Sequence, residues 1–197
     1  GSEMCIRDRY ISPSRHRNIM SGFSTVSKSS KSTEYGTPKD FFDKLNKIFR
    51  FSLDPCTTED NPLGTERFFT LKENGLDQEW NDNTFINPPF GRGIDKWLRT
   101  MYEEAMKYPS FNYVMLLPAR TDTRWFQDLI VDKYDINNNS VIYLLKGRLK
   151  FVNPVLNGGS EPHIIGSMLW MLNTKGSELV DLKNTMPGVL IKWYKKN

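Results

Sequence analysis

The sequence predicts an α/β fold with a mostly parallel sheet, helices on both faces and antiparallel strands at one edge. Short apolar runs that end in polar or proline residues alternate with stretches of helical periodicity through the middle of the chain. Towards the end of the chain, apolar runs follow one another without long helices between them, which favours antiparallel pairing there. A length of 197 residues suits one domain with a sizeable core.

Helical and strand-like patterns give the expected order of elements. The first helix should begin with Thr37 as its cap and Pro38 in its first turn, with apolar residues on one face up to Phe49. Further helices are expected over residues 93–107, around 125–130 and over 175–183. Strands are expected at residues 51–53, 67–71, 83–87, 113–117, 141–145, 164–172 and 189–193, with residues 147–151 pairing with 141–145. Trp80 and Trp97 are expected in the core.

Charge and composition set the ends of the chain apart from its body. We expect residues 1–33 to be a tag or leader followed by a flexible arm rich in Ser and Lys, and residues 34–197 to be a single domain. Of the 27 basic and 23 acidic side chains, six and two lie in residues 1–33, which leaves 21 of each in the body. A pI near 9.0 is therefore weak evidence for nucleic-acid binding, although a genuine basic arm could touch phosphates.

Two function classes receive no support from the residues. No apolar run approaches the length of a membrane span, so no membrane partner is expected. The two cysteines, Cys5 and Cys56, have no metal-ligand spacing, so we expect no metal site, no disulfide and a reducing compartment. His163 has no histidine partner in the body and is interpreted as a packing or hydrogen-bonding residue.

The motif Asn87-Pro88-Pro89-Phe90 is the most informative feature of the chain. It follows the apolar run Thr84-Phe85-Ile86, and two successive prolines cannot donate ladder hydrogen bonds, so a strand must end there. The side-chain oxygen of Asn87 and the carbonyl of Pro88 could both accept hydrogen bonds from an exocyclic amino group, while Phe90 stacks on the base that carries it. The alternative interpretation is a proline-rich strand exit with a core phenylalanine.

Several motifs in a fixed order resemble the phage-type, Dam-like DNA N6-adenine methyltransferases. The resemblance covers roughly residues 35 to 170, and the stretch from Leu116 to Phe126 is its most specific part. The matching segments are Tyr35-Gly36-Thr37-Pro38, Leu53-Asp54-Pro55-Cys56, Asn74-Gly75-Leu76-Asp77-Gln78-Glu79-Trp80, Asn87-Pro88-Pro89-Phe90, Leu116-Leu117-Pro118-Ala119-Arg120-Thr121-Asp122-Thr123-Arg124-Trp125-Phe126 and Gly147-Arg148-Leu149-Lys150-Phe151.

This resemblance implies a Rossmann-like methyltransferase fold and S-adenosyl-L-methionine as the cofactor. The positions that match the family's catalytic motif are Asn87, Pro88, Pro89 and Phe90. The positions that match its cofactor-binding segments are Tyr35, Thr37, Pro38, Asp54, Cys56, Gly75, Leu76 and Asn87. In one departure from many methyltransferases, the loop after the first strand, residues 54–58, contains no glycine.

DNA is the expected partner, double-stranded and with the target base flipped out of the helix. Arg120 and Arg124 follow a strand end and could contact phosphate or a base edge, or else form a solvated pair beside a cap at Thr121 or Asp122. Lys146, Arg148 and Lys150 alternate and could form a basic strip for the DNA backbone, or else a solvated edge strand. Base reading is expected from residues 56–66, 118–126 and 152–163.

The sequence thus predicts a small adenine-N6 DNA methyltransferase, a monomer or weak dimer, encoded by a phage or prophage and acting in the bacterial cytoplasm. Cytosine-N4 or another amino group remains open as the target, because similar four-residue motifs serve those reactions. A catalytically inactive DNA-binding module with the same fold is the alternative from another class. The missing glycine-rich loop and the neutral body favour that module, and the intact Asn-Pro-Pro-Phe motif disfavours it.

Overall fold

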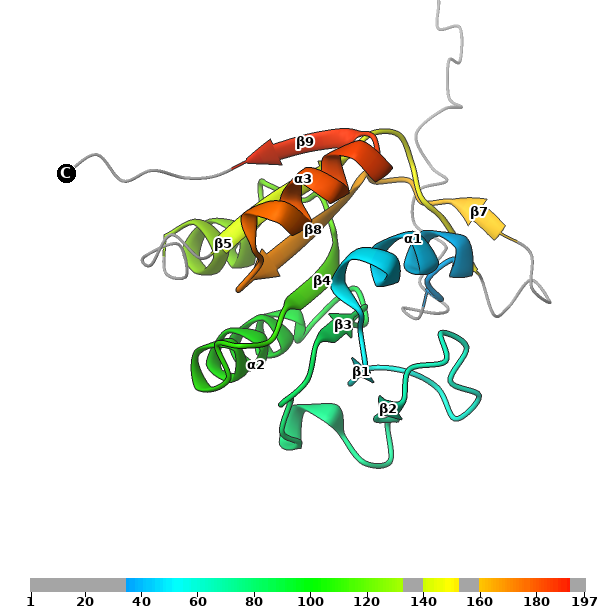
Figure 1. Ribbon diagram of the computed structural model, residues 1–197, viewed down its shortest axis with the longest axis vertical. Helices are drawn as coiled ribbons and strands as arrows, with labels where there is room; N and C mark the ends of the chain where they lie inside the picture. Colours follow the sequence, from blue (N-terminus) through cyan, green and yellow to red (C-terminus); the bar gives the residue numbers. More distant parts are fainter. Residues whose placement is uncertain (1–34, 133–139, 153–159, 192–197) are drawn as a thin grey trace, which may run out of the picture. The chain divides into compact units, whose positions relative to one another are not determined.

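A seven-stranded mixed sheet organises the computed structural model, which describes residues 35–132, 140–152 and 160–191. The expectations for residues 1–33 and for Trp193 lie outside these ranges. The strand order is β2-β1-β3-β4-β8-β5-β9, and the strands can be followed in Figure 1. Their bounds are β1 Leu53–Asp54, β2 Arg67–Phe68, β3 Thr84–Ile86, β4 Tyr113–Pro118, β5 Ser140–Leu145, β8 Ser167–Leu172 and β9 Gly188–Ile191.

Half of the sheet is parallel and half is antiparallel. Strands β2, β1, β3 and β4 pair in parallel, with Leu53 opposite Thr84 and Phe85 opposite Val114. Strand β8 runs antiparallel to both β4 and β5, so β5 points in the same direction as β4. Strand β9 then pairs antiparallel with β5 at the outer edge. The predicted fold class is confirmed, with the antiparallel strands gathered on one side of a parallel core.

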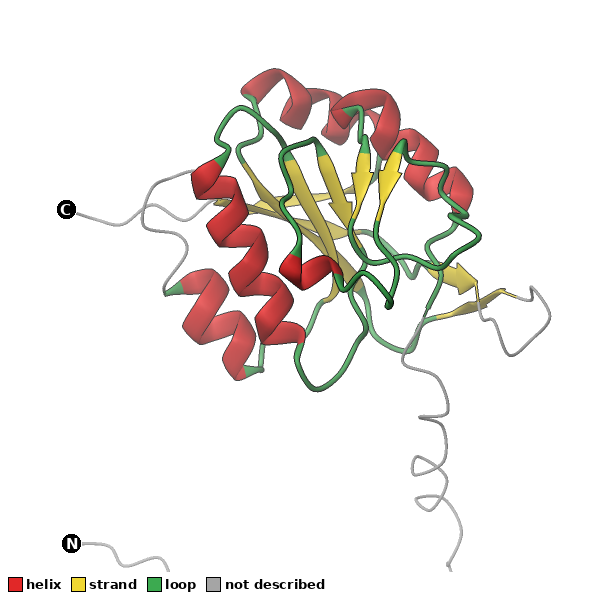
Figure 2. Cartoon of the chain, turned by 90° about the horizontal axis from the view of Figure 1, so that it is seen from below, coloured by secondary structure: helices red, strands yellow, loops and turns green. Residues whose placement is uncertain are grey.

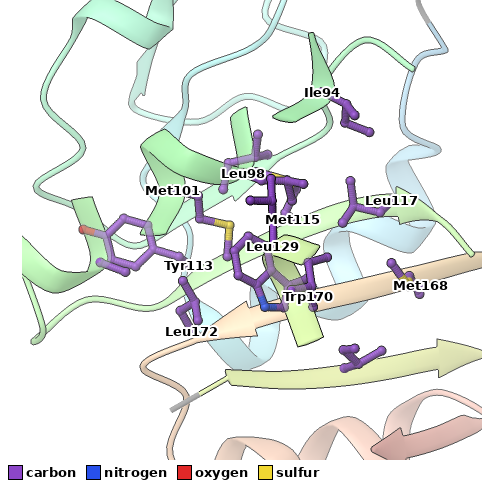
Figure 3. Packing of buried hydrophobic residues seen from close by; sticks show 14 of the residues in the cluster. Ile94, Leu98, Met101, Tyr113, Met115, Leu117, Leu129, Met168, Trp170 and Leu172 are labelled. Atoms are coloured by element: carbon purple, nitrogen blue, oxygen red, sulfur yellow. The ribbon is translucent and has the colours of Figure 1, made fainter. Parts of the chain in front are cut away.

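Helices cover both faces of the sheet, as Figure 2 shows. Helices α1 (Lys39–Phe49) and α3 (Gly176–Thr185) pack together on one face, and α2 (Ile94–Lys107) packs with the π-helix η2 (Trp125–Val131) on the other. Successive strand residues point to opposite faces, so β4 contributes Val114 and Leu116 to the α1 side and Tyr113, Met115 and Leu117 to the α2 side. Figure 3 shows the hydrophobic cluster on the α2 side of the sheet, where residues of β4 and β8 pack against Leu98 and Met101 of α2.

Most of the predicted elements are present within a residue or two of their expected bounds. The helical face from Phe41 to Phe49 is buried, and Trp80 is fully buried with Trp97 stacked against it at 6.1 Å between ring centroids. The turn expected at Asn74-Gly75 leads into a short 3-10 helix, η1 (Gly75–Asp77). The winding of η2 is wider than that of an α-helix, since the amide of Asp132 donates to the carbonyl of Gln127, five residues back.

The start of α1 differs from the prediction. Pro38, not Thr37, is the cap residue, with extended backbone angles and no side-chain cap hydrogen bond. The carbonyl of Pro38 accepts from the amide of Phe42, and Thr37 is buried instead of turning back to the helix. The preceding residues are hydrogen-bonded to other segments, Tyr35 to Asn87 and Gly36 to Val152. These bonds set the direction in which the chain enters the helix.

The predicted pairing of residues 147–151 with the strand at 141–145 is wrong. Gly147 takes a positive φ of 86° and turns the chain out of the main sheet after β5. The following strand, β6 (Lys150–Val152), pairs antiparallel with β7 (Ser160–Pro162) in a separate two-stranded sheet. Gly36 bridges to Val152 on the other side of β6.

No helix among the described residues is long and apolar enough to cross a membrane.

Candidate active site

Two polar residues leave the sheet at the carboxyl ends of neighbouring parallel strands. Asp54 is the last residue of β1, and Asn87 follows the last residue of β3. Since Leu53 lies opposite Thr84, the two strands end at the same edge. Ligands of α/β sheets bind at this edge, where the strand ends present side chains and free backbone groups. The predicted placement of Asp54 and Asn87 is therefore observed, and the edge is the candidate site.

The side-chain amide of Asn87 is held at its nitrogen and unpaired at its oxygen. Nδ2 donates to the backbone carbonyl of Tyr35 at 2.6 Å. Oδ1 is buried and has no hydrogen-bond partner within the described part of the chain. Because the carbonyl of Tyr35 can only accept, it fixes which amide atom faces it and leaves Oδ1 as the free acceptor. A desolvated acceptor without a partner is costly unless a ligand supplies the donor.

The segment that holds Asn87 is itself held by β6. Gly36 donates to the carbonyl of Val152 at 2.9 Å, and Val152 donates back to the carbonyl of Gly36 at 2.9 Å. A Cβ atom on Gly36 would lie 3.3 Å from Cβ of Val152, so glycine allows this close approach. The segment with Tyr35, Thr37 and Pro38, which the resemblance assigns to the cofactor, thus begins between the Asn-Pro-Pro-Phe motif and the small sheet.

Four rings close together beside this segment: Tyr35, Phe90, Phe151 and His163. The ring centroids of all their pairs lie 5.2–6.1 Å apart, and most pairs are edge-to-face. Phe151 is buried, whereas Tyr35, Phe90 and His163 are half-buried. Phe90 is thus in contact with three other rings at this edge.

Asp54 is a buried carboxyl group at the strand end. The residue is 2% exposed, and Oδ1 accepts the amide of Cys56 at 3.0 Å. Burial raises the pKa of this carboxyl from its ordinary 3.8 to about 7, against the opposing effect of hydrogen bonds from the Cys56 amide and the Thr57 side chain. A carboxyl group with a pKa near neutrality, at a ligand-binding edge, is a candidate for binding a cationic group.

Gly75 packs directly against the loop that follows Asp54. A Cβ atom at this position would lie 1.9 Å from the carbonyl oxygen of Pro55, so no other residue fits without a shift of the backbone. The indole nitrogen of Trp80 donates to the carbonyl of Gly75 at 2.8 Å and fixes the segment from below. Leu76 is half-buried next to it. The structure therefore brings Gly75 and Leu76 to the loop that carries Asp54 and Cys56.

The predicted DNA-contacting residues are all exposed, but they are not equivalent. Arg120 is ion-paired with Asp122 at 3.3 Å, and this arginine holds the pKa of Asp122 below its ordinary value. Arg124 immediately precedes η2 and is exposed. No side chain caps η2, so the alternative of a cap at Thr121 or Asp122 is not supported.

The predicted basic strip does not form as one strand face. Lys146 and Arg148 lie in the turn around Gly147, and only Lys150 belongs to β6, where it is exposed. The physical reason is the left-handed conformation of Gly147, which breaks the alternation on which the strip depended.

The structure places three further residues at this edge. Phe151 and His163 join the ring cluster, and His163 also hydrogen-bonds with the carbonyl of Ile165, which agrees with its interpretation as a packing or hydrogen-bonding residue. Ser167 begins β8 opposite Pro118, is 2% exposed, and its Oγ has no partner within residues 35–132, 140–152 and 160–191. The contacts of the ring cluster join segments that are far apart in the sequence, so local patterns do not predict them. The only sequence signal for His163 is its position after Pro162 and before an apolar strand.

No cluster of three or more metal-ligating side chains occurs among the residues that the structure describes. The candidate site consists of an amide with a free oxygen acceptor, aromatic rings and a buried carboxyl group at the carboxyl edge of a parallel sheet core. Polar and aromatic side chains at this edge are typical of α/β proteins that bind a small ligand there.

Comparison with known families gives the particular family. The family model described as DNA N-6-adenine-methyltransferase (Dam) matches residues 24–186, and the chain belongs to this family. A crystal structure of protein LPL1258 from Legionella pneumophila, of family DUF519, is 17% identical with a TM-score of 0.39. That match covers 66% of this chain and 52% of the Legionella chain. A search of curated protein sequences found no match.

Proposed function

We propose that this protein transfers a methyl group from S-adenosyl-L-methionine to the N6 amino group of adenine in double-stranded DNA. The observation that carries the proposal is the Asn87 amide, whose Nδ2 is bound by the Tyr35 carbonyl and whose buried Oδ1 is left without a partner in the described chain. Family membership supports adenine over cytosine as the target base.

The chemistry requires two acceptors for one amino group. The N6 nitrogen of adenine is a poor nucleophile because its lone pair is delocalised into the ring. Oδ1 of Asn87 and the carbonyl of Pro88 accept its two hydrogens, which turns the lone pair towards the methyl donor. Orientation of this kind contributes about 7–11 kcal/mol to catalysis. The rigid Pro88-Pro89 pair keeps the second acceptor in place.

The target base must leave the duplex to reach Asn87. Flipping costs a few kcal/mol. Stacking on Phe90 returns roughly 1–3 kcal/mol of this cost. In the structure Phe90 already contacts three other rings, and Oδ1 of Asn87 is covered. Binding of the base therefore involves a local rearrangement of the ring cluster as well as of the DNA.

The cofactor segments fit the donor by their chemistry. Ionised Asp54 would hold the ammonium group of the methionine part, and the residues around Cys56 and Gly75 would line the rest of the molecule. Gly75 supports this assignment because its lack of a side chain lets two loops approach closely at the edge. S-adenosylmethionine, when bound, supplies an activated methyl group on a sulfonium centre.

DNA contact is proposed through exposed basic side chains near the site: Arg120, Arg124, Arg148 and Lys150. They would bind phosphates, which positions the protein without reading sequence. The setting we propose is a bacterial cell that carries the gene on a phage or prophage, with the protein acting as a monomer or weak dimer.

Modified-base sequencing of DNA from cells that express the protein tests the proposal. We expect N6-methyladenine at one short sequence motif, and far less of it in cells that express the Asn87→Ala variant. N4-methylcytosine instead would move the target to the other base. Binding of the donor and DNA without any modified base would leave the inactive DNA-binding module as the better account.

A further inference from the structure

We propose that the backbone of Tyr35 and Gly36, held by β6, is a positioning element that selects the catalytic orientation of the Asn87 amide. The inference rests on the proposed function and adds to it a part of the chain far from the motif. An unbroken series of hydrogen bonds connects Asn87 through Tyr35 and Gly36 to Val152. A side-chain amide has two nearly isosteric ends, and catalysis needs the oxygen on the side of the substrate.

The Tyr35 carbonyl makes that choice. At 2.6 Å from Nδ2 it accepts a hydrogen bond, whereas a flipped amide would place two oxygen acceptors against each other. The flipped amide would also leave Nδ2 facing the amino group of the substrate, so that two donors would meet. The position of the Tyr35 carbonyl therefore determines that Nδ2 of Asn87 is the bonded atom and that Oδ1 is the acceptor available to the substrate.

The Gly36–Val152 bridge in turn places the carbonyl of Tyr35. The amide and carbonyl groups of one residue in an antiparallel pair point to the same side. Both groups of Val152 are bonded to Gly36, so neither contributes to the ladder between β6 and β7. The bridge can thus be broken at Val152 without removing a hydrogen bond from the small sheet.

The Val152→Pro variant removes the amide hydrogen that bonds to Gly36, and Val152→Ala keeps it as the matched comparison. We expect kcat of V152P to be about 10- to 100-fold below that of V152A, because small misplacements of reacting groups have effects of this size. The KM values for donor and DNA should agree between the two variants within about threefold. The chemical shift of the Asn87 side-chain amide should move in V152P and stay in V152A.

The Asn87→Asp variant tests the same carbonyl without any change in β6. Its carboxylate has only acceptors, so the atom facing Tyr35 must carry a proton before the other atom can serve the substrate. We expect the rate of methyl transfer by N87D, divided by that of the unaltered protein at the same pH and with saturating donor, to increase as the pH falls, since Asp54 titrates in both proteins. Faster transfer at high pH, where the carboxyl group is ionised, would overturn the inference.

Failure of the inference can be told apart from failure of the proposed function. If the unaltered protein forms N6-methyladenine while V152P and V152A share one kcat and one Asn87 amide shift, the positioning role is wrong and the activity stands. If the unaltered protein forms no N6-methyladenine, the proposed function fails first. Thermal unfolding of V152P within about 4 °C of V152A confirms that both variants are folded.

Discussion

The side-chain amide of Asn87 is hydrogen-bonded at Nδ2, and its Oδ1 has no partner within the described chain. The candidate site is built around this difference between the two amide atoms. A stabilising role alone would be served by pairing both ends of the amide. The bond to Tyr35 fixes the nitrogen, and Oδ1 is buried at the place where we propose that the amino group of the substrate binds. A buried polar group without a partner calls for an explanation, and for Asn87 we propose a role in catalysis.

Replacement of Asn87 by alanine is expected to remove methyl transfer but not donor binding. Loss of one preorganised hydrogen-bonding group typically lowers kcat by about 10²- to 10³-fold. The dissociation constant for S-adenosylmethionine, measured by calorimetry, should stay within about threefold. A large loss of donor affinity would place Asn87 in the cofactor site rather than at the substrate.

Phe90→Ala should lower transfer to a paired adenine more than transfer to a mismatched or single-stranded one. The stacking that Phe90 offers is needed to offset the cost of flipping, and that cost is smallest when the base is unpaired. Steady-state rates on the three substrates check this. Equal losses on all of them would argue that Phe90 only supports the ring cluster with Tyr35 and Phe151.

Asp54 gives the protein a defined dependence on pH. Its pKa is about 7 in the folded state against an ordinary 3.8, so between these values the folded state binds a proton that the unfolded state has lost. The contribution of Asp54 to the free energy of unfolding therefore falls as the pH rises from about 4 to about 7. Asp54→Asn removes the titrating group.

The profile of melting temperature against pH should therefore be flatter for Asp54→Asn than for the unaltered protein across this window. Above pH 7 the variant should be the more stable of the two when no donor is present. If the two profiles run parallel, the carboxyl group titrates as an ordinary surface aspartate and its assignment to the donor ammonium loses its support.

At the level of elements, η1 packs through Gly75 against the loop after β1, at the edge where we propose that the donor binds. Gly75→Ala would force Cβ against the carbonyl of Pro55, and overpacking of this kind costs typically about 1–3 kcal/mol of stability. We expect a lower melting temperature together with weaker donor binding. Gly176→Ala is the matched control, because it lies in α3 with open space around it, and it should leave donor binding unchanged.

The positions of strands and helices could be predicted from local sequence patterns, whereas the partner of each strand could not always be predicted. The end of β3 was predictable because two prolines must terminate a strand, and the α2 helix because apolar residues recur at helical spacing. The partner of residues 150–152 was not, because it depends on a positive φ at Gly147 and on Gly36 more than 100 positions earlier. The ring cluster was missed for the same reason.

At the scale of the whole molecule, the net charge of +4 resides in residues 1–33, and the body is neutral. The sequence could predict the fold class and the position of Asn87 at the end of β3, since both rest on order and local chemistry. It could not reveal that Oδ1 is unpaired or that Asp54 is buried, because these are properties of packing between distant segments. Local basic residues, not overall charge, should therefore govern DNA binding.

Deletion of residues 1–33 tests that view. We expect the shortened chain to keep its kcat and to show a slope of log affinity against log salt within about one unit of the full chain, since no phosphate contacts are lost. Fluorescence anisotropy with labelled duplex DNA at several salt concentrations measures this slope. A clear reduction would show that the first residues form a basic arm that binds phosphates.

The most direct test of the central claim is a single-turnover assay with labelled S-adenosylmethionine and an unmethylated duplex, with the product base identified by mass spectrometry. The unaltered protein should form N6-methyladenine, and Asn87→Ala should form it about 10²- to 10³-fold more slowly with the donor still bound. Transfer by Asn87→Ala at the unaltered rate, or a product other than N6-methyladenine, would contradict the account.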